Sequence, residues 1–180
     1  LVTMHHIISD GWSMGIFFKE VSAFYNAYCK TLLEGTEFPS SNLLPVLDVQ
    51  YADFALWQRK WLQGEVLEQQ LGYWKKQLSG IPSFLELVTD RPRPKEPSYK
   101  GSTYYQTLSK ELKDQIYKLS QGHQASVFMT LLAIFQILLF RYSGQKDIVV
   151  GSPIANRHYR ETEGLIGFFV NTLALRTVFD

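Results

Sequence analysis

The sequence of 180 residues lacks several features that mark particular classes of protein. It has one cysteine, Cys29, so no internal disulfide can form, which agrees with a reducing compartment. Eighteen basic residues stand against seventeen acidic ones, and a net charge of +1 attracts neither nucleic acid nor an anionic membrane. No apolar run has the length of a membrane span, and no signal-peptide pattern opens the chain. We expect a cytoplasmic protein without nucleic-acid or membrane partners.

The residues that are present predict a packed α/β (α+β) protein. Hydrophobic residues make up 46% of the chain and aromatic residues 14%, which is enough for a sizeable core. Apolar periodicity predicts helices, and runs of strand-forming residues predict strands. Asp48 is expected to cap the second helix. The predicted helices cover 12–30, 49–63 and 126–142; a further helix follows Gly64 and is ended by Gly80, and another starts at Ser109. The predicted strands cover 1–4, 101–108, 147–152 and 168–179. The helix over 126–142 is apolar nearly all round and is therefore expected to be buried on most sides.

A proline-rich segment divides the chain. Four of the seven prolines lie between Pro82 and Pro97, and such a segment favours an extended path with few internal hydrogen bonds. We predict a first lobe over 1–80, a linker over 81–100 and a second lobe over 101–180.

The most informative stretch is the run His5-His6-Ile7-Ile8-Ser9-Asp10-Gly11. Histidine exchanges protons near neutral pH, a carboxylate can orient it, and glycine leaves a backbone N–H open to a developing oxyanion. Simpler interpretations exist for each residue type. Asp10 can be the N-cap of the helix that follows it, and a histidine pair is often only packing. A zinc site is disfavoured, because the spacing is not H-E-x-x-H and, with one cysteine, a closed site would need Asp or Glu ligands from elsewhere.

Four motifs in order resemble the condensation domains of nonribosomal peptide synthetases, in the chloramphenicol-acetyltransferase-like superfamily. Residues 4–13 match H-H-x-x-x-D-G-W-S and residues 51–58 match Y-x-D-F-A-x-W-Q. Residues 151–157 match G-x-P-x-x-x-R, and residues 166–172 match I-G-x-F-V-N-T. The resemblance implies a fragment of a two-lobed fold with mixed sheets flanked by helices. It also implies amide formation between aminoacyl or peptidyl thioesters held on the 4'-phosphopantetheine arms of carrier domains, with an adenylation domain as a further partner and no cofactor bound directly.

The same resemblance assigns roles to the histidine run. His6 is expected at the reacting centre, as a base or an electrostatic stabiliser, and His5 in support of the loop. Asp10 is expected to pair with an arginine that precedes this chain, and the N–H of Gly11 is a candidate oxyanion donor. For Arg157 two interpretations stay open, a side chain facing the site or one that pairs with a carboxylate.

Asn171 is the other candidate at the substrate tunnel, where it either faces the substrate or satisfies a buried backbone group. In the motif over 51–58 the aromatic residues are expected to pack and not to react.

Several alternatives stay open on the sequence alone. A scaffold domain that only docks carrier proteins, a related acyltransferase and an epimerisation domain all remain in view, although Trp12 and Ser13 after Asp10-Gly11 favour the condensation form. Met4 before the histidine pair and the residues Ile7-Ile8-Ser9 after it resemble domains that join an L-configured donor to an L-configured acceptor, so an L-configured donor is slightly favoured. Because the motifs begin close to Leu1, we expect an incomplete domain whose isolated chain is poorly soluble and inactive, with His6 open to solvent.

Overall fold

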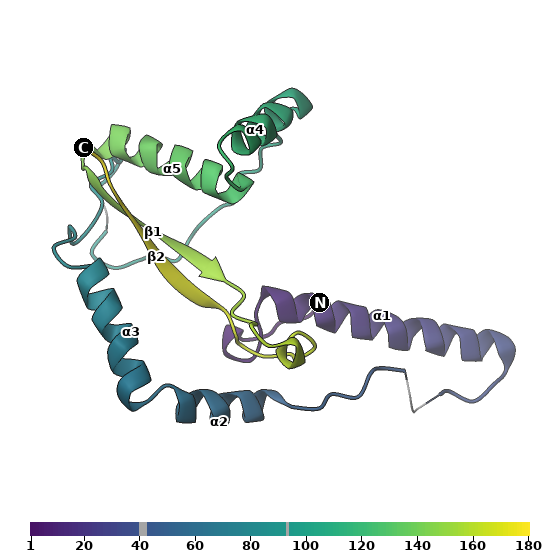
Figure 1. Cartoon of the computed structure of the whole chain (residues 1–180). Helices are drawn as coiled ribbons and strands as arrows, with labels where there is room; N and C mark the ends of the chain where they lie inside the picture. Colours follow the sequence, from purple (N-terminus) through teal and green to yellow (C-terminus); the bar gives the residue numbers. More distant parts are fainter. Residues whose placement is uncertain (40–42, 93) are drawn as a thin grey trace. The chain divides into compact units, whose positions relative to one another are not determined.

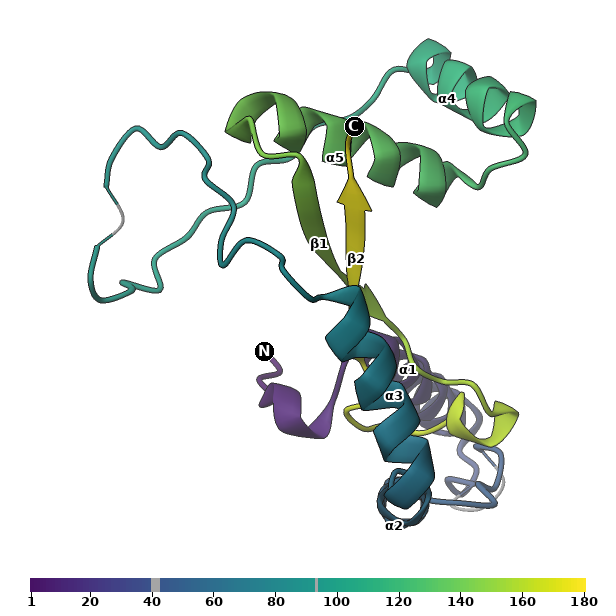
Figure 2. The same ribbon diagram turned by 60° about the vertical axis from the view of Figure 1, so that its left-hand side comes forward.

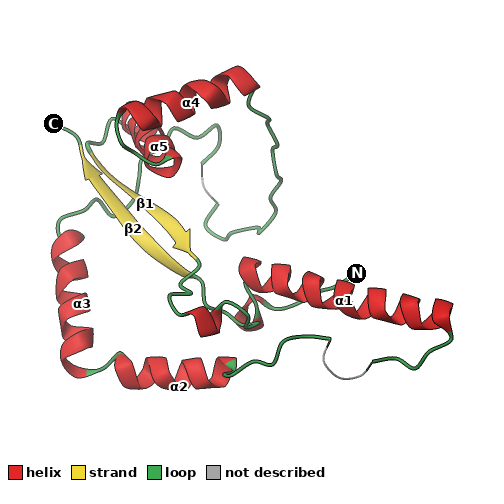
Figure 3. Ribbon diagram, turned by 45° about the vertical axis from the view of Figure 1, so that its right-hand side comes forward, coloured by secondary structure: helices red, strands yellow, loops and turns green. Residues whose placement is uncertain are grey.

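A computed structural model describes residues 1–39, 43–92 and 94–180. Helices predominate among these residues, and a pair of strands forms the sheet (Figures 1 and 3). The helices are α1 (Gly11–Glu34), α2 (Tyr51–Trp61), α3 (Gly64–Gln77), α4 (Lys110–Gly122) and α5 (Val127–Ser143). The strands are β1 (Asp147–Ile154) and β2 (Asn171–Val178), and two single 3₁₀ turns cover His6–Ile8 and Arg160–Thr162.

The chain folds into two compact units, each built from separate stretches of sequence. One unit contains Leu1–Gln77 and Gly151–Leu173, and the other contains Leu78–Val150 and Ala174–Asp180. The first unit therefore brings α1, α2 and α3 together with the segment that connects the two strands. The lobe boundaries predicted from the proline-rich segment remain a prediction.

Side-chain caps fix the N-terminal ends of three helices. Asp10 caps α1, Ser109 caps α4 and Ser126 caps α5, each accepting a hydrogen bond from the backbone N–H three residues later. Glycines end two of the helices: Gly35 after α1 and Gly144 after α5 both adopt a left-handed conformation, with φ of 64° and 69°. The predicted helices are thus confirmed within a few residues of their ends.

The cap predicted for the second helix was wrong. Gln50, and not Asp48, precedes α2, and it forms a reciprocal capping box in which the Asp53 carboxylate accepts from the Gln50 N–H at 2.8 Å. The helix therefore begins at Tyr51, two residues later than predicted.

Two predicted strands are absent from the described structure, and a third is shorter than predicted. Residues 1–4 and 101–108 are irregular and mostly exposed, because strand-forming residues adopt a strand only when a neighbouring strand pairs with them. The strand predicted from Phe168 begins at Asn171, because the N–H groups of Phe169 and Val170 donate to the Asp10 carboxylate and not to another strand. By contrast, β1 is confirmed and extends two residues beyond its predicted end.

The strands run antiparallel. The Phe179 N–H donates to the Lys146 carbonyl at 2.8 Å, while further along the sheet Gly151 lies beside Thr172. As the residue number rises on one strand it therefore falls on the other.

Helix α5 is less buried than its composition predicts. Within α5 Gln136 is the buried residue, and apolar side chains such as Phe128 and Leu131 are exposed. Gln136 ties the helix to the sheet, since its amide donates to the Leu175 carbonyl at 3.3 Å and accepts from the Thr177 hydroxyl at 3.0 Å. Near the C-terminus the rings of Phe140 and Phe179 stack, and Figure 2 shows the end of the chain beside α5. The expectation of a helix buried on most sides was therefore wrong.

Among the residues that the structure describes, no single helix has the length and apolar character to cross a membrane. The pair α4 and α5, bent by 101° at the break between them, meets those two criteria only when taken together.

Candidate active site

The histidine run forms a short exposed loop in which the two imidazoles are held differently. His6 lies 2.7 Å, measured from Nδ1, from the carbonyl oxygen of Ser9. A carbonyl can only accept, so His6 Nδ1 carries the proton and Nε2 of the neutral ring keeps its lone pair. His5 has the opposite arrangement: its Nδ1 accepts from the Ile7 N–H at 3.0 Å, which places the proton of the neutral ring on Nε2. Both side chains are exposed, as expected for His6.

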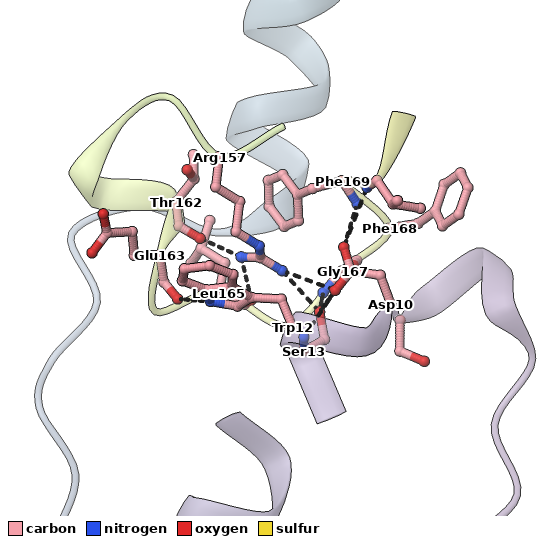
Figure 4. Close-up of polar contacts among 12 residues, drawn as sticks. Asp10, Trp12, Ser13, Arg157, Thr162, Glu163, Leu165, Gly167, Phe168 and Phe169 are labelled. Atoms are coloured by element: carbon pink, nitrogen blue, oxygen red, sulfur yellow. Dashed lines mark hydrogen bonds and ion pairs between the residues drawn. The ribbon is translucent and has the colours of Figure 1, made fainter. Parts of the chain in front are cut away.

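Asp10, directly behind this loop, uses both carboxylate oxygens. Oδ1 accepts from the Ser13 N–H at 2.8 Å and from the Ser13 hydroxyl at 2.7 Å, while Oδ2 accepts from the Phe169 N–H at 3.0 Å (Figure 4). Burial alone would raise the pKa of Asp10, but the hydrogen bonds from Ser13 and Phe169 and the charge of Arg157 outweigh it and lower the pKa to about 2. The carboxylate is therefore ionised throughout the physiological range.

The ionic partner of Asp10 is Arg157. Its Nη2 lies 3.3 Å from Asp10 Oδ1, and the two side chains are 1% and 3% exposed, so this is a buried ion pair. The expectation that the partner precedes this chain was wrong. Because 147 residues separate the pair, only the fold reveals it. The two interpretations of Asp10 are both correct, since one carboxylate caps α1 and pairs with the arginine.

The Arg157 guanidinium also contacts backbone carbonyls and aromatic rings, although its buried Nε has no hydrogen-bond partner among the described residues. Nη1 donates to the carbonyl oxygens of Thr162 and Leu165, the latter at 2.8 Å. The guanidinium lies 4.0 Å from the centre of the Phe169 ring and 5.7 Å from that of Trp12. Burial lowers the pKa of Arg157, and the neighbouring Asp10 opposes that change. Of its two interpretations, the structure supports pairing with a carboxylate.

Ser13 joins the same cluster, although the sequence analysis assigned it no role. Its side chain is 0% exposed, and its hydroxyl donates to Asp10 and lies 2.8 Å from the Gly167 carbonyl oxygen. The same hydroxyl oxygen accepts from the Gly167 N–H at 3.0 Å and from Arg157 at 2.9 Å. The signal in the sequence was its position, the third residue of a helix whose cap is Asp10, where a side chain can reach back to the cap.

The segment 166–170 packs closely against α1 and α2. An added Cβ at Gly167 would lie 2.2 Å from Cδ2 of Tyr51, so only glycine fits against that ring. The hydroxyl of Tyr51 donates to the Phe168 carbonyl at 2.9 Å, and its ring packs edge-on against Phe169. The packing role expected for the aromatic residues of the second motif is seen here.

The other two candidates do not join the buried cluster. Gly11 is the first residue of α1, and an added Cβ there would meet no atom within 4 Å among the described residues. Asn171 is exposed, and its side chain accepts a hydrogen bond from the adjacent Thr172 N–H at 2.8 Å. Within 1–39, 43–92 and 94–180 no group of three or more His, Cys, Asp or Glu is arranged to hold a metal ion. The roles of Gly11 and Asn171 remain predictions.

Comparisons with known proteins agree on one family. A family model described as Condensation domain matches residues 1–180. A linear gramicidin synthase chain from Brevibacillus parabrevis is 55% identical over 177 residues, which are 98% of this chain and 3% of that protein. Malpinin synthetase from Mortierella alpina is 48% identical over 176 residues, which are 98% of this chain and 2% of that protein. The chain thus spans a small fraction of these relatives.

Solved structures agree as well. The X-domain from teicoplanin biosynthesis superposes with a TM-score of 0.82 at 26% identity, covering 97% of this chain and 38% of that one. The first condensation domain of the CDA synthetase shares the fold, with a TM-score of 0.72 at 21% identity over 98% of this chain and 36% of that one. The predicted fold class, that of the chloramphenicol-acetyltransferase-like proteins, is confirmed.

We predict that Asp10→Asn destabilises the intact protein by about 3–5 kcal/mol at pH 7, because an amide cannot accept on both sides and leaves Arg157 buried without a counter-ion. The unfolded carboxyl has its ordinary pKa of 3.8, whereas the folded one lies near 2. The stability that the lowered pKa contributes, about 2 kcal/mol, is complete above pH 4 and is lost as the pH falls through 2. Urea unfolding at a series of pH values measures both effects.

The exposed Asp114→Asn on α4 is the matched control and should match wild type. Identical unfolding of Asp10→Asn and wild type at pH 7 would show that Asp10 acts only as a cap, because Asn caps as well as Asp.

We also predict that Gly167→Ala lowers the free energy of unfolding by about 1–3 kcal/mol, since the new methyl forces the Tyr51 ring from its position. Gly15→Ala in α1 is the control, because its Cβ meets no described atom within 4 Å and alanine is the better helix former. Thermal or urea unfolding measures both variants, and an unchanged midpoint for Gly167→Ala would contradict the packing described here.

Proposed function

The chain belongs to the condensation-domain family, and from this premise we propose that it carries the reaction centre for amide formation between carrier-tethered thioesters. The α-amine of a downstream aminoacyl thioester attacks the carbonyl carbon of an upstream aminoacyl or peptidyl thioester. A C–N bond forms, the C–S bond breaks, and the proton lost by the amine balances the thiolate that leaves. A thioester is already activated, so the main tasks are to align the two substrates and to manage the proton and the developing charge.

The observation that carries the proposal is the contact of His6 Nδ1 with the Ser9 carbonyl, from which the tautomer of His6 follows. With Nδ1 hydrogen-bonded to the Ser9 carbonyl at 2.7 Å, Nε2 is the free basic nitrogen of an exposed ring. It can accept a hydrogen bond, and then the proton, from the attacking amine. His5 lacks this property, because its Nδ1 accepts from the Ile7 N–H and its Nε2 carries the proton. We therefore assign the acid–base role to His6 and a loop-supporting role to His5.

The residues around His6 take supporting roles in this proposal. Asp10 and Arg157 hold the loop, since their buried pair connects the residue after Ser9 to the distant segment 157–170. The N–H of Gly11 is proposed as an oxyanion donor because it is the first residue of α1, where backbone N–H groups lack intrahelical partners. Asn171 is proposed to line the substrate path, on the basis of its exposed position at the start of β2.

The proposed partners follow from the substrates. The aminoacyl groups arrive on the phosphopantetheine arms of carrier domains, and an adenylation domain of the same assembly line loads them. The likeness to a gramicidin synthase chain supports this assignment. A cytoplasmic location is also included in the proposal, supported by the single cysteine.

We predict that His6→Ala in the intact protein lowers the rate of condensation by at least about 10², the low end of the contribution of a positioned acid–base group. His5→Ala should lose less, and should lose it together with thermal stability, because its ring caps the 3₁₀ turn. His123→Ala, at the exposed end of α4, should retain full activity.

The measurement is single-turnover formation of the dipeptidyl thioester from two loaded carrier domains, with circular dichroism to check the fold. Equal turnover by His6→Ala and wild type would refute the assignment of His6. If wild type formed no product while still binding both carrier domains, a docking or scaffold role would replace the catalytic one.

A further inference from the structure

Phe168 is the aromatic residue in contact with His6 in the described structure. The centres of the two rings lie 5.2 Å apart, and their planes meet at 87°, so they pack edge to face. Phe168 is 40% exposed, and His6 is exposed too. The two residues are therefore in contact and both reachable by solvent.

The backbone on both sides of Phe168 is fixed by buried polar groups. The Ser13 hydroxyl contacts both the N–H and the carbonyl of Gly167, at 3.0 and 2.8 Å. The Tyr51 hydroxyl donates to the carbonyl of Phe168 itself, at 2.9 Å. The Asp10 carboxylate accepts from the Phe169 N–H. Three consecutive residues are thus held by three different side chains, and the Phe168 ring projects from a rigid support.

The two adjacent phenylalanines point in different directions. Phe169 is 2% exposed, and its ring lies against Arg157 (Figure 4). The same ring packs against Tyr51 and Phe54. Successive side chains of an extended segment face opposite ways, so the same backbone that buries Phe169 turns Phe168 toward His6. The burial of Phe169 therefore determines where the Phe168 ring lies.

We infer that Phe168 is a positioning and specificity-determining residue for the His6 centre. The imidazole is held by two contacts, the Ser9 carbonyl on Nδ1 and the Phe168 ring, which together restrict its rotation. A substrate amine hydrogen-bonded to His6 Nε2 approaches an imidazole that Phe168 borders. The exposed face of the phenyl ring then packs against the side chain on the α-carbon of the acceptor aminoacyl group. Phe168 limits the size of the acceptor side chain that reaches the centre.

This inference rests on the proposed condensation activity, and the experiment separates the two. The intact protein and its Phe168→Ala, Phe168→Leu and Phe168→Tyr variants are assayed with acceptor carriers loaded with glycine, alanine or phenylalanine. Phe168→Ala should lower kcat for glycine by about 10-fold, through a misplaced imidazole, with KM unchanged. For the same variant, the ratio of the rate with the phenylalanine acceptor to the rate with the glycine acceptor should rise by about 10-fold, because the Phe168 ring no longer limits the size of the acceptor side chain.

The other variants make the result specific to the ring. Phe168→Leu keeps an apolar side chain on the same support and should shift the same ratio in the same direction by a smaller factor. Phe168→Tyr keeps the aromatic ring and should therefore have the wild-type kcat. Phe18→Ala is the matched control, since Phe18 is a half-exposed phenylalanine on α1 whose ring packs on Phe17, and it should leave the ratio unchanged.

Each outcome then has one interpretation. Wild-type kcat and selectivity in both Phe168→Ala and Phe168→Leu, in a protein whose His6→Ala variant is inactive, would overturn this inference alone. Inactivity of wild type would instead refute the proposed function. A loss of kcat with an unchanged selectivity ratio would refute the specificity role.

Discussion

The buried ion pair between Asp10 and Arg157 is the interaction on which the rest of the first unit depends. Removing two charges from water costs several kcal/mol for each, and the cost is offset only where the remaining lone pairs and protons also find partners. Here most of them do: the carboxylate accepts from Ser13, Phe169 and Val170, and the guanidinium donates to two carbonyls and to Ser13. Of the guanidinium nitrogens, Nε is buried without a hydrogen-bond partner among the described residues. The pair thus joins three segments that are distant in sequence, the histidine loop with the start of α1, the loop after β1 and the entry to β2.

One carboxylate therefore performs several tasks that are usually separate. Asp10 ends the histidine loop, caps α1 and neutralises Arg157. It also accepts the hydrogen bonds of the Phe169 and Val170 N–H groups in place of a neighbouring strand, so β2 begins only at Asn171. The geometry of the candidate site follows from this arrangement. Ser9, whose carbonyl sets the tautomer of His6, directly precedes Asp10, and Phe168, whose ring contacts His6, directly precedes Phe169. Each of these two contacts of His6 lies one residue from a backbone point that Asp10 fixes.

The helices could largely be predicted from the sequence because their signals are local. Ser109, Ser126 and Gly144 act through the residues within one turn of them, so their effect can be predicted without the fold. Strands 1–4 and 101–108 were predicted wrongly, since a strand depends on a partner that local composition does not reveal. The same holds for the candidate site. The histidine run could be singled out from the sequence, but the pairing of Asp10 with Arg157, the contact of Ser13 with Gly167 and the contact of Phe168 with His6 all join residues far apart in sequence.

A double-mutant cycle between Asp10 and Arg157 tests the central claim most directly. Asp10→Asn, Arg157→Met and the double variant are unfolded in urea at pH 7, and the coupling free energy is obtained from the unfolding curves of these variants and wild type. We predict a coupling of about 2–3 kcal/mol, because once one charge is removed the other is already uncompensated and its removal costs little more. Additive losses, with a coupling below about 0.5 kcal/mol, would contradict the account and show that the two residues stabilise the fold independently.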